Sequence, residues 1–224
     1  MSSLIQLYRV YNTVIEMLED RNYDKKTIEE LYKNKTFDEF KALYKENLID
    51  IQCNHQTQKK KIVVHFLHLT NKFKKEEFQF QLDDLKQQII ETNYEFTFHL
   101  LIISKQKLSV AMQKLFQDFK INSDEKFTDF IYVQYFNFSE LLFNVTKHSL
   151  VPKHTVLSND EKKQLLDNYS ITPMQIAKII ITPTVKEKYV DPVAKYLGML
   201  PGDVCKITRR SETGGESLSY RIAK

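Results

Sequence analysis

Glycine and proline are absent from the first 151 of the 224 residues. All four glycines lie at or beyond Gly198, and all five prolines lie at or beyond Pro152. Glycine permits backbone conformations that other residues avoid, and proline fixes φ. We therefore expect short elements and sharp corners in the C-terminal third, whereas the turns of the remaining chain must use Asn, Asp, Lys and Ser.

Long apolar runs, paired cysteines and glycine-rich loops are also missing. No stretch without Asp, Glu, Lys or Arg exceeds 10 residues, whereas a membrane helix needs about 20 apolar residues. The start, MSSLIQLYRV, lacks the features of a secretory signal. Cys53 and Cys205 stand far apart, which predicts buried thiols in a reducing compartment and no disulfide framework. GxGxxG, P-loop and GxSxG motifs are absent, so we expect no nucleotide cofactor and no serine hydrolase.

The modest net charge of +4 is unevenly distributed. Residues 147–224 carry 13 Lys and Arg against 8 Asp and Glu, whereas residues 1–146 carry 20 against 21. Domains that bind nucleic acid usually have a clear basic face or stripe. Charge alone therefore does not assign this chain to nucleic-acid-binding proteins.

Residues 1–146 alternate between helical and strand-like patterns, which predicts an α/β layered domain with some parallel pairing. Two capping boxes, Thr27 with Glu30 and Thr36 with Glu39, predict the starts of short helices. The predicted helices are 4–21, 82–91 and 108–120, and the predicted strands are 48–53, 61–69, 95–104 and 127–136.

Residues 147–224 predict a small α+β domain. Ser158 with Glu161 forms a third capping box. Asp191 before Pro192 is typical of a helix N-cap, and Gly198 is placed to end that helix. Two strand-like runs, 203–210 and 217–223, flank SETGGE, which predicts a β-hairpin.

Few residues are placed to carry out chemistry. His65 and His68 are three apart in a strand-like run and would face opposite sides, so they cannot share one metal ion. Asp50 is the one candidate magnesium ligand on the first two predicted strands, which is too few for a nuclease centre. We expect no metal site. The SETGG turn could form a nest for an anion beside Arg209, although a hairpin turn is the commoner role of two glycines.

Three ordered motifs in the second region carry a family resemblance. HSLVPKH begins at His148, DPVAKYLG begins at Asp191, and RRSETGG begins at Arg209. Together they closely resemble the C-terminal domain of the fifth-largest subunit shared by eukaryotic RNA polymerases I, II and III. In the archaeal enzyme, a small polymerase subunit corresponds to this domain alone. Lys195 replaces the arginine usual in the family, and residues 179–190 form a longer segment than usual.

The resemblance implies a non-catalytic subunit of a multisubunit DNA-directed RNA polymerase. Residues 147–224 would form the assembly domain that docks on the largest subunit. Residues 1–146 would form a nuclease-like but inactive α/β domain of the lower jaw, near downstream DNA, with Lys59, Lys60 and Lys61 as the DNA-proximal residues. The implied partner-binding residues are His148, Pro152, His154, Asp191, Pro192, Tyr196, Arg209, Ser211, Glu212, Thr213, Tyr220 and Arg221.

Other readings of the sequence remain open. We expect other polymerase subunits as partners, no self-association, no membrane and a nuclear location, with the virion or host cytoplasm as the alternative for a virus-encoded chain. A free-standing nucleic-acid-binding module that uses the Arg209–Gly215 hairpin is the second hypothesis, and it predicts salt-sensitive binding by the isolated chain. A cryptic nuclease is the third.

Overall fold

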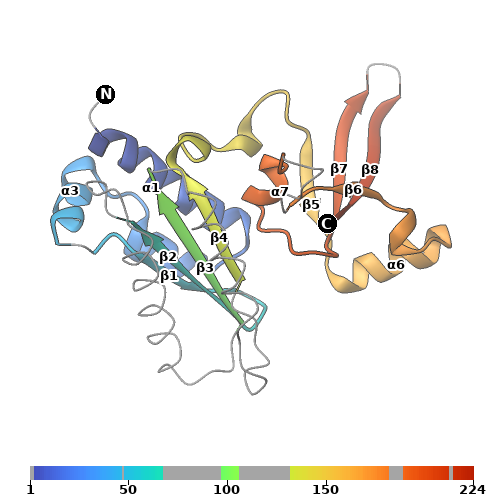
Figure 1. Ribbon diagram of the computed structural model, residues 1–224, viewed down its shortest axis with the longest axis horizontal. Helices are drawn as coiled ribbons and strands as arrows, with labels where there is room; N and C mark the ends of the chain where they lie inside the picture. Colours follow the sequence, from blue (N-terminus) through green and yellow to red (C-terminus); the bar gives the residue numbers. More distant parts are fainter. Residues whose placement is uncertain (1–2, 47, 68–96, 106–131, 182–188, 212–213) are drawn as a thin grey trace. The chain divides into compact units, whose positions relative to one another are not determined.

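The computed structural model describes residues 3–46, 48–67, 97–105, 132–181, 189–211 and 214–224. The chain divides into two compact units, Met1–Phe143 and Asn144–Lys224. We call them the N-terminal unit and the C-terminal unit. Each has its own sheet (Figure 1), which agrees with the predicted combination of an α/β and an α+β part.

The N-terminal unit begins with helix α1, Ser3–Asp20, close to the predicted helix 4–21. Its apolar stripe is buried, and the ring of Tyr11 lies 6.0 Å from that of Phe66 in the sheet. Burial of such a stripe, more than intrinsic propensity, stabilises a helix. Three short elements follow: α2, Lys25–Thr27; the π-helical turn η1, Ile28–Tyr32; and α3, Phe37–Lys45.

One of the two predicted capping boxes in this region is correct. Thr36 and Glu39 cap α3 reciprocally, with the Thr36 N–H donating to Glu39 Oε2 over 2.7 Å. The prediction for Thr27 and Glu30 is wrong. Asp24 caps α2 instead, because its carboxylate accepts the Lys26 and Thr27 N–H groups and begins the helix three residues earlier.

The sheet of the N-terminal unit has the order β1-β2-β3-β4. An antiparallel hairpin, β1 with β2, is followed by parallel pairing of β2 with β3 and of β3 with β4. The predicted parallel pairing is therefore confirmed. The predicted helices 82–91 and 108–120, the connections between these strands, lie outside the described residues. The strand bounds are Ile51–Asn54, Lys60–Phe66, Thr97–Ser104 and Tyr132–Asn137, and the 3₁₀ turn η2, Phe138–Glu140, follows β4.

The C-terminal unit contains a second four-stranded sheet of order β5-β7-β8-β6. Its pairs are antiparallel except β6 with β8. The β7–β8 hairpin extends beyond the other strands (Figure 1), and Gly215 has φ +77° where β8 begins. The elements are η3, Val145–Lys147; β5, Lys153–Val156; α6, Asn159–Tyr169; η4, Pro173–Gln175; β6, Ala177–Ile179; α7, Pro192–Tyr196; β7, Val204–Ser211; and β8, Gly215–Ala223.

Two apolar clusters hold this second sheet between its helices. On one face, Cys205 and Ile207 of β7 pack with Ala194 of α7. On the other face, Val204 of β7 packs with Leu165 of α6. Successive residues of β7 thus serve opposite faces, as strand geometry requires. The predicted Ser158 box begins α6, Asp191 begins α7, and Gly198 follows α7 with φ +68°.

Candidate partner-binding site

A groove of about 600 Å³ lies on the face of the second sheet that packs against α7. We call it the α7-side groove. Four parts of the chain form it: the approach to β5, strand β6, the segment that enters α7, and the central strands of the sheet. The residues that line it are 150–152, His154, 178–180, 189–193, Ile207, Arg209 and Arg221.

Local hydrogen bonds fix the turn at the entrance of the groove. The His148 carbonyl accepts from the Val151 N–H over 2.9 Å, and the imidazole Nδ1 of His148 accepts from the Leu150 N–H over 3.3 Å. His154 donates its Nδ1–H to the carbonyl of Pro152, two residues before it, over 2.7 Å. Both histidines therefore shape the backbone before β5 and present Leu150 to solvent.

The groove carries more positive than negative charge. Arg209 and Arg221 line it with exposed side chains, whereas Lys178 lies opposite Ile222 of the α6-side cluster and meets Arg221 through its carbonyl. Asp191, its one carboxylate, is held by α7: Oδ1 accepts the N–H groups of Val193 and Ala194 over 2.9 and 2.8 Å. The guanidinium Nη1 of Arg221 donates to the Lys178 carbonyl over 3.2 Å, so the backbone of β6 helps to hold this guanidinium at the groove.

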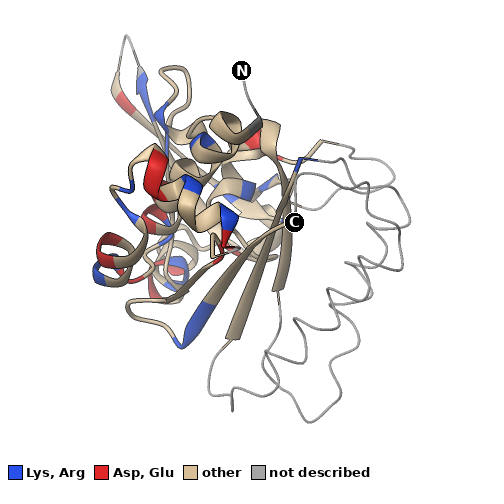
Figure 2. Cartoon of the chain, turned by 90° about the vertical axis from the view of Figure 1, so that its left-hand side faces the viewer, with Lys and Arg blue, Asp and Glu red and all other residues tan. Residues whose placement is uncertain are grey.

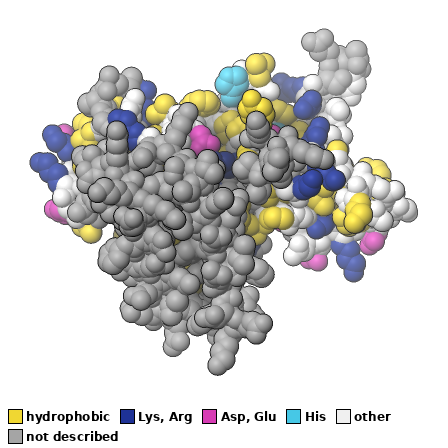
Figure 3. Space-filling view, in the orientation of Figure 1, with side chains coloured by type: hydrophobic (Ala, Val, Ile, Leu, Met, Phe, Trp, Pro, Cys, Tyr) yellow, Lys and Arg dark blue, Asp and Glu magenta, His cyan; other side chains and the backbone are white. Residues whose placement is uncertain are grey.

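Apolar side chains stand beside these charges. Leu150 is 85% exposed and Tyr189 is 90% exposed. Both line the groove. Figure 3 shows hydrophobic and basic side chains next to one another on the surface of the C-terminal unit. Single exposed apolar residues need no explanation, but a group of them at a groove marks a candidate binding surface.

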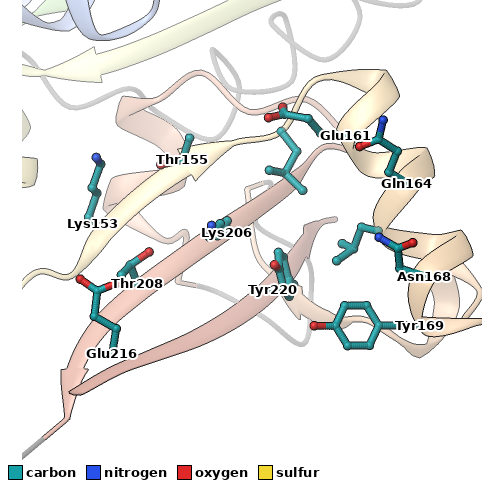
Figure 4. A pocket seen from close by; sticks show the side chains of 12 residues that line it. Lys153, Thr155, Glu161, Gln164, Asn168, Tyr169, Lys206, Thr208, Glu216 and Tyr220 are labelled. Atoms are coloured by element: carbon teal, nitrogen blue, oxygen red, sulfur yellow. The ribbon is translucent and has the colours of Figure 1, made fainter. Parts of the chain in front are cut away.

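A second groove, of about 530 Å³, lies on the opposite face of the sheet, beside α6 (Figure 4). In this α6-side groove, Lys153 and Lys206 are matched by Glu161 and Glu216. The Ser158 backbone N–H donates to Glu161, and this hydrogen bond lowers the pKa of that carboxyl. The α6-side groove is therefore electrically balanced, unlike the α7-side groove.

The structure brings six of the twelve predicted partner-binding residues into the α7-side groove: Pro152, His154, Asp191, Pro192, Arg209 and Arg221. His148 lies at its entrance, Ser211 ends β7, and Tyr220 lines the other groove. Tyr196 is 1% exposed and belongs to the interior. Glu212 and Thr213 lie outside the described residues.

Nine lining residues of the groove were not among the predicted site residues, and the exposed Leu150 and Tyr189 are two of them. Leu150 lies within the HSLVPKH motif, so an exposed apolar residue beside a proline was an available signal. Tyr189 comes from the longer segment 179–190, where the sequence offered only an irregular length.

The candidate catalytic groups are used for structure. Asp50 Oδ2 accepts from His65 Nδ1 over 2.5 Å, and Oδ1 accepts from the Phe66 N–H over 3.0 Å. His68 lies outside the described residues. Cys53 and Cys205 are buried, as expected, and burial raises their pKa values to about 12 and about 11. Among the described residues, no three His, Cys, Asp or Glu side chains are grouped to hold a metal ion.

Lys59, Lys60 and Lys61 lie at the turn from β1 to β2 and at the start of β2. Lys59 is exposed and the other two are half-buried. In Figure 2, basic and acidic residues are intermixed over the described elements. The three lysines are therefore a local basic turn on a unit whose surrounding charge is mixed.

Two family comparisons bear on this arrangement. The model described as RNA polymerase Rpb5, C-terminal domain, matches residues 143–223 and so covers both grooves. The model described as RNA polymerase Rpb5, N-terminal domain, matches residues 2–76. The chain belongs to the Rpb5 family of RNA polymerase subunits. The resemblance noted from the three sequence motifs is thereby confirmed.

Curated relatives extend the family assignment along the whole chain. A Dictyostelium discoideum protein named as a subunit of DNA-directed RNA polymerases I, II and III is 29% identical over 222 residues, 99% of each chain. An Arabidopsis thaliana subunit of polymerases IV and V is 28% identical over 96% of this chain and 88% of its own. The archaeal Rpo5 subunit of Pyrococcus horikoshii is 46% identical over 80 residues, which are 36% of this chain and 88% of the archaeal one.

Rpb5-family membership places the chain in transcription, as a polypeptide related throughout to polymerase subunits. The archaeal match is confined to 80 residues, and it has the highest identity of these three relatives. Among the described residues, no helix has the length and hydrophobicity that a membrane-spanning segment requires.

Proposed function

We propose that this chain is a non-catalytic subunit of a nuclear DNA-directed RNA polymerase and that its C-terminal unit docks on the largest subunit through the α7-side groove. The observation that carries the proposal is the convergence of six predicted docking residues, from four separated parts of the sequence, on one groove. A protein interface needs such a continuous surface with apolar anchors and a polar rim. Exposed Leu150 and Tyr189 supply the anchors.

A non-catalytic role fits the chemistry of the described residues. Asp50, the one carboxylate considered for a nuclease centre, accepts two hydrogen bonds within its own unit. The two thiols are buried with raised pKa values, so they are poor nucleophiles. Nucleotide addition would then belong to other subunits of the assembly.

For the N-terminal unit we propose a place in the lower jaw, near downstream DNA. Lys59 at the β1–β2 turn, followed by Lys60 and Lys61, is the segment we assign to phosphate contact. A few lysines bring weak, sequence-independent attraction to the duplex. The contact would therefore matter only within the assembled enzyme, where other subunits hold the DNA.

A nuclear location is proposed from the relatives. Two of those described above are named as subunits of eukaryotic RNA polymerases. The alternative of a virus-encoded chain, which would place the protein in the virion or host cytoplasm, finds no support in these relatives.

Affinity capture of the tagged full-length chain, followed by mass spectrometry, tests the proposal. We expect the largest polymerase subunit to be recovered together with the other subunits, in amounts comparable to the chain itself. Recovery of the chain without any polymerase subunit would contradict the proposal. Salt-sensitive DNA binding by that lone chain would favour the free-standing module instead, and magnesium-dependent cleavage would favour a nuclease.

A further inference from the structure

We infer that the α7-side groove receives an acidic segment of the largest subunit, in which carboxylates alternate with or adjoin apolar side chains. This inference rests on the proposed function, because it names the chemistry of the partner at the same site. It goes beyond that function in stating which part of the partner is recognised and by which groups.

The cations of the groove are available to a partner. Arg209 and Arg221 are exposed, and within the part of the chain that the structure describes neither lies within salt-bridge distance of a carboxylate. Asp191 is the one carboxylate that lines the groove, so a net positive charge remains beside the two arginines. Arginine pairs well with carboxylates because its planar guanidinium can donate two parallel hydrogen bonds.

The apolar residues favour a protein segment over nucleic acid. Leu150 and Tyr189 are almost fully exposed at the groove, and the buried side chains of Ile179 and Ile207 form part of its lining. A phosphate backbone offers no aliphatic groups to cover such a surface, whereas a peptide that bears Leu, Val or Phe beside Asp or Glu covers it. The groove therefore fits an acidic segment with apolar side chains.

The opposite face of the same sheet provides the comparison. The α6-side groove is of similar size, about 530 Å³ against about 600 Å³, but its two lysines face two glutamates. Figure 4 shows Lys153 of β5 and Glu216 of β8 on strands that flank β7, with Lys206 of β7 between Thr155 and Tyr220. Charge selection of an acidic partner is thus a property of one face of the C-terminal unit, which makes the other face a matched control.

Charge reversal on the two faces tests the inference in the full chain. Arg209→Glu with Arg221→Glu should lower incorporation into the polymerase by about tenfold or more, because repulsion replaces attraction at the docking surface. Lys153→Glu with Lys206→Glu makes the same change of net charge on the α6 side and should leave incorporation within about twofold of the unchanged chain. Far-UV circular dichroism of both variants checks that the exposed substitutions leave the fold intact.

The partner segment is then identified and its charge reversed. A photo-crosslinking amino acid in place of Tyr189, in the assembled polymerase, should link to the largest subunit, and mass spectrometry gives the linked segment. Replacing the Asp and Glu residues of that segment by Lys should restore incorporation of the Arg209→Glu, Arg221→Glu chain. Restoration supports an acidic partner at this groove.

Different outcomes overturn different claims. If the unchanged chain does not enter the polymerase, the proposed function fails and the inference fails with it. If the unchanged chain enters but both double variants behave alike, the α7-side groove does not select charge and this inference alone fails. Crosslinks to nucleic acid, or a charge-reversed partner that does not restore incorporation, also overturn the inference while the docking function stands.

Discussion

At the scale of single residues, Asp50 shows how a candidate catalytic group becomes a structural one. Its two carboxylate oxygens accept from the His65 ring and from the Phe66 N–H, so it ties the start of β1 to the end of β2. A magnesium ligand would need free oxygens and neighbouring carboxylates. The absence of a carboxylate on the next predicted strand, 61–69, pointed to this outcome, but the histidine partner could not be inferred without the register of β1 on β2.

We predict that Asp50→Ala lowers the free energy of unfolding of the N-terminal unit by about 1–2 kcal/mol, because the Phe66 N–H and the His65 ring lose their acceptor. Asp50→Asn is the matched control, since its amide oxygen can still accept from the Phe66 N–H, and it should lose less. Urea unfolding followed by labelling of Cys53, which is buried in this unit, measures both. An Ala variant with the midpoint of the unchanged chain would contradict this role.

The buried Cys205 thiol should make the stability of the C-terminal unit fall at alkaline pH. Burial raises its pKa from 9.0 to about 11. Above pH 9 the unfolded chain forms the thiolate while the folded chain does not, so stability is full below pH 9 and is lost as pH rises towards 11. At pH 10 the expected loss is about 1 kcal/mol.

Pulse alkylation of Cys205 across a urea series, at pH 8 and at pH 10, measures this loss. Because the thiol is buried, labelling reports unfolding of the C-terminal unit alone. We expect a lower urea midpoint at pH 10. Identical midpoints at the two pH values would show that the thiol titrates normally in the folded chain.

At the scale of elements, the caps show what the sequence could and could not specify. The Ser158 and Thr36 boxes and the Asp191 cap are local patterns, and each was predicted at its residue. The pair Thr27 and Glu30 has the same spacing, yet Asp24 begins the helix and Thr27 donates its hydroxyl to it. Two adjacent candidates compete for one helix start, and the spacing rule does not rank them.

Helix α7 depends on its cap more than most helices, because it has only five residues. We predict that Asp191→Ala lowers the free energy of unfolding of the C-terminal unit by about 1 kcal/mol, since the Val193 and Ala194 N–H groups lose their acceptor. Asp191→Asn should retain nearly all of the stability, because asparagine caps about equally well. The Cys205 labelling midpoint reports both variants, as Ala194 packs in the same cluster as Cys205. Equal losses for Ala and Asn would contradict a capping role.

At the scale of the whole molecule, the division into two units was visible in composition, while the groove was not. Glycine and proline occur only beyond residue 151, within the C-terminal unit, whose helices and strands are short. The groove requires β5 to pair with β7 and β6 with β8, contacts between segments up to about 55 residues apart. Spacing along the chain cannot give such pairings, so the sequence could name Arg209 and His154 but not place them on one surface.

The C-terminal unit should act as an independent docking domain. Its two apolar clusters and all four strands of its sheet lie within residues 144–224. The 80 matched residues are 88% of the archaeal relative. A polymerase subunit therefore exists that consists of little more than the counterpart of this unit. We therefore predict that residues 144–224, expressed alone, unfold cooperatively in urea and compete with the full-length chain for incorporation into the polymerase.

The competition is measured with a differently tagged full-length chain at a fixed amount and a rising amount of the fragment. The same fragment with Arg209→Glu and Arg221→Glu is the control, and it should fold but compete at least about tenfold less well, because the cations that attract the partner are reversed. Residues 1–143 should not compete, since their expected contact is weak attraction to DNA within the assembled enzyme. A folded fragment 144–224 that fails to displace the full-length chain would mean that the docking surface extends into the N-terminal unit.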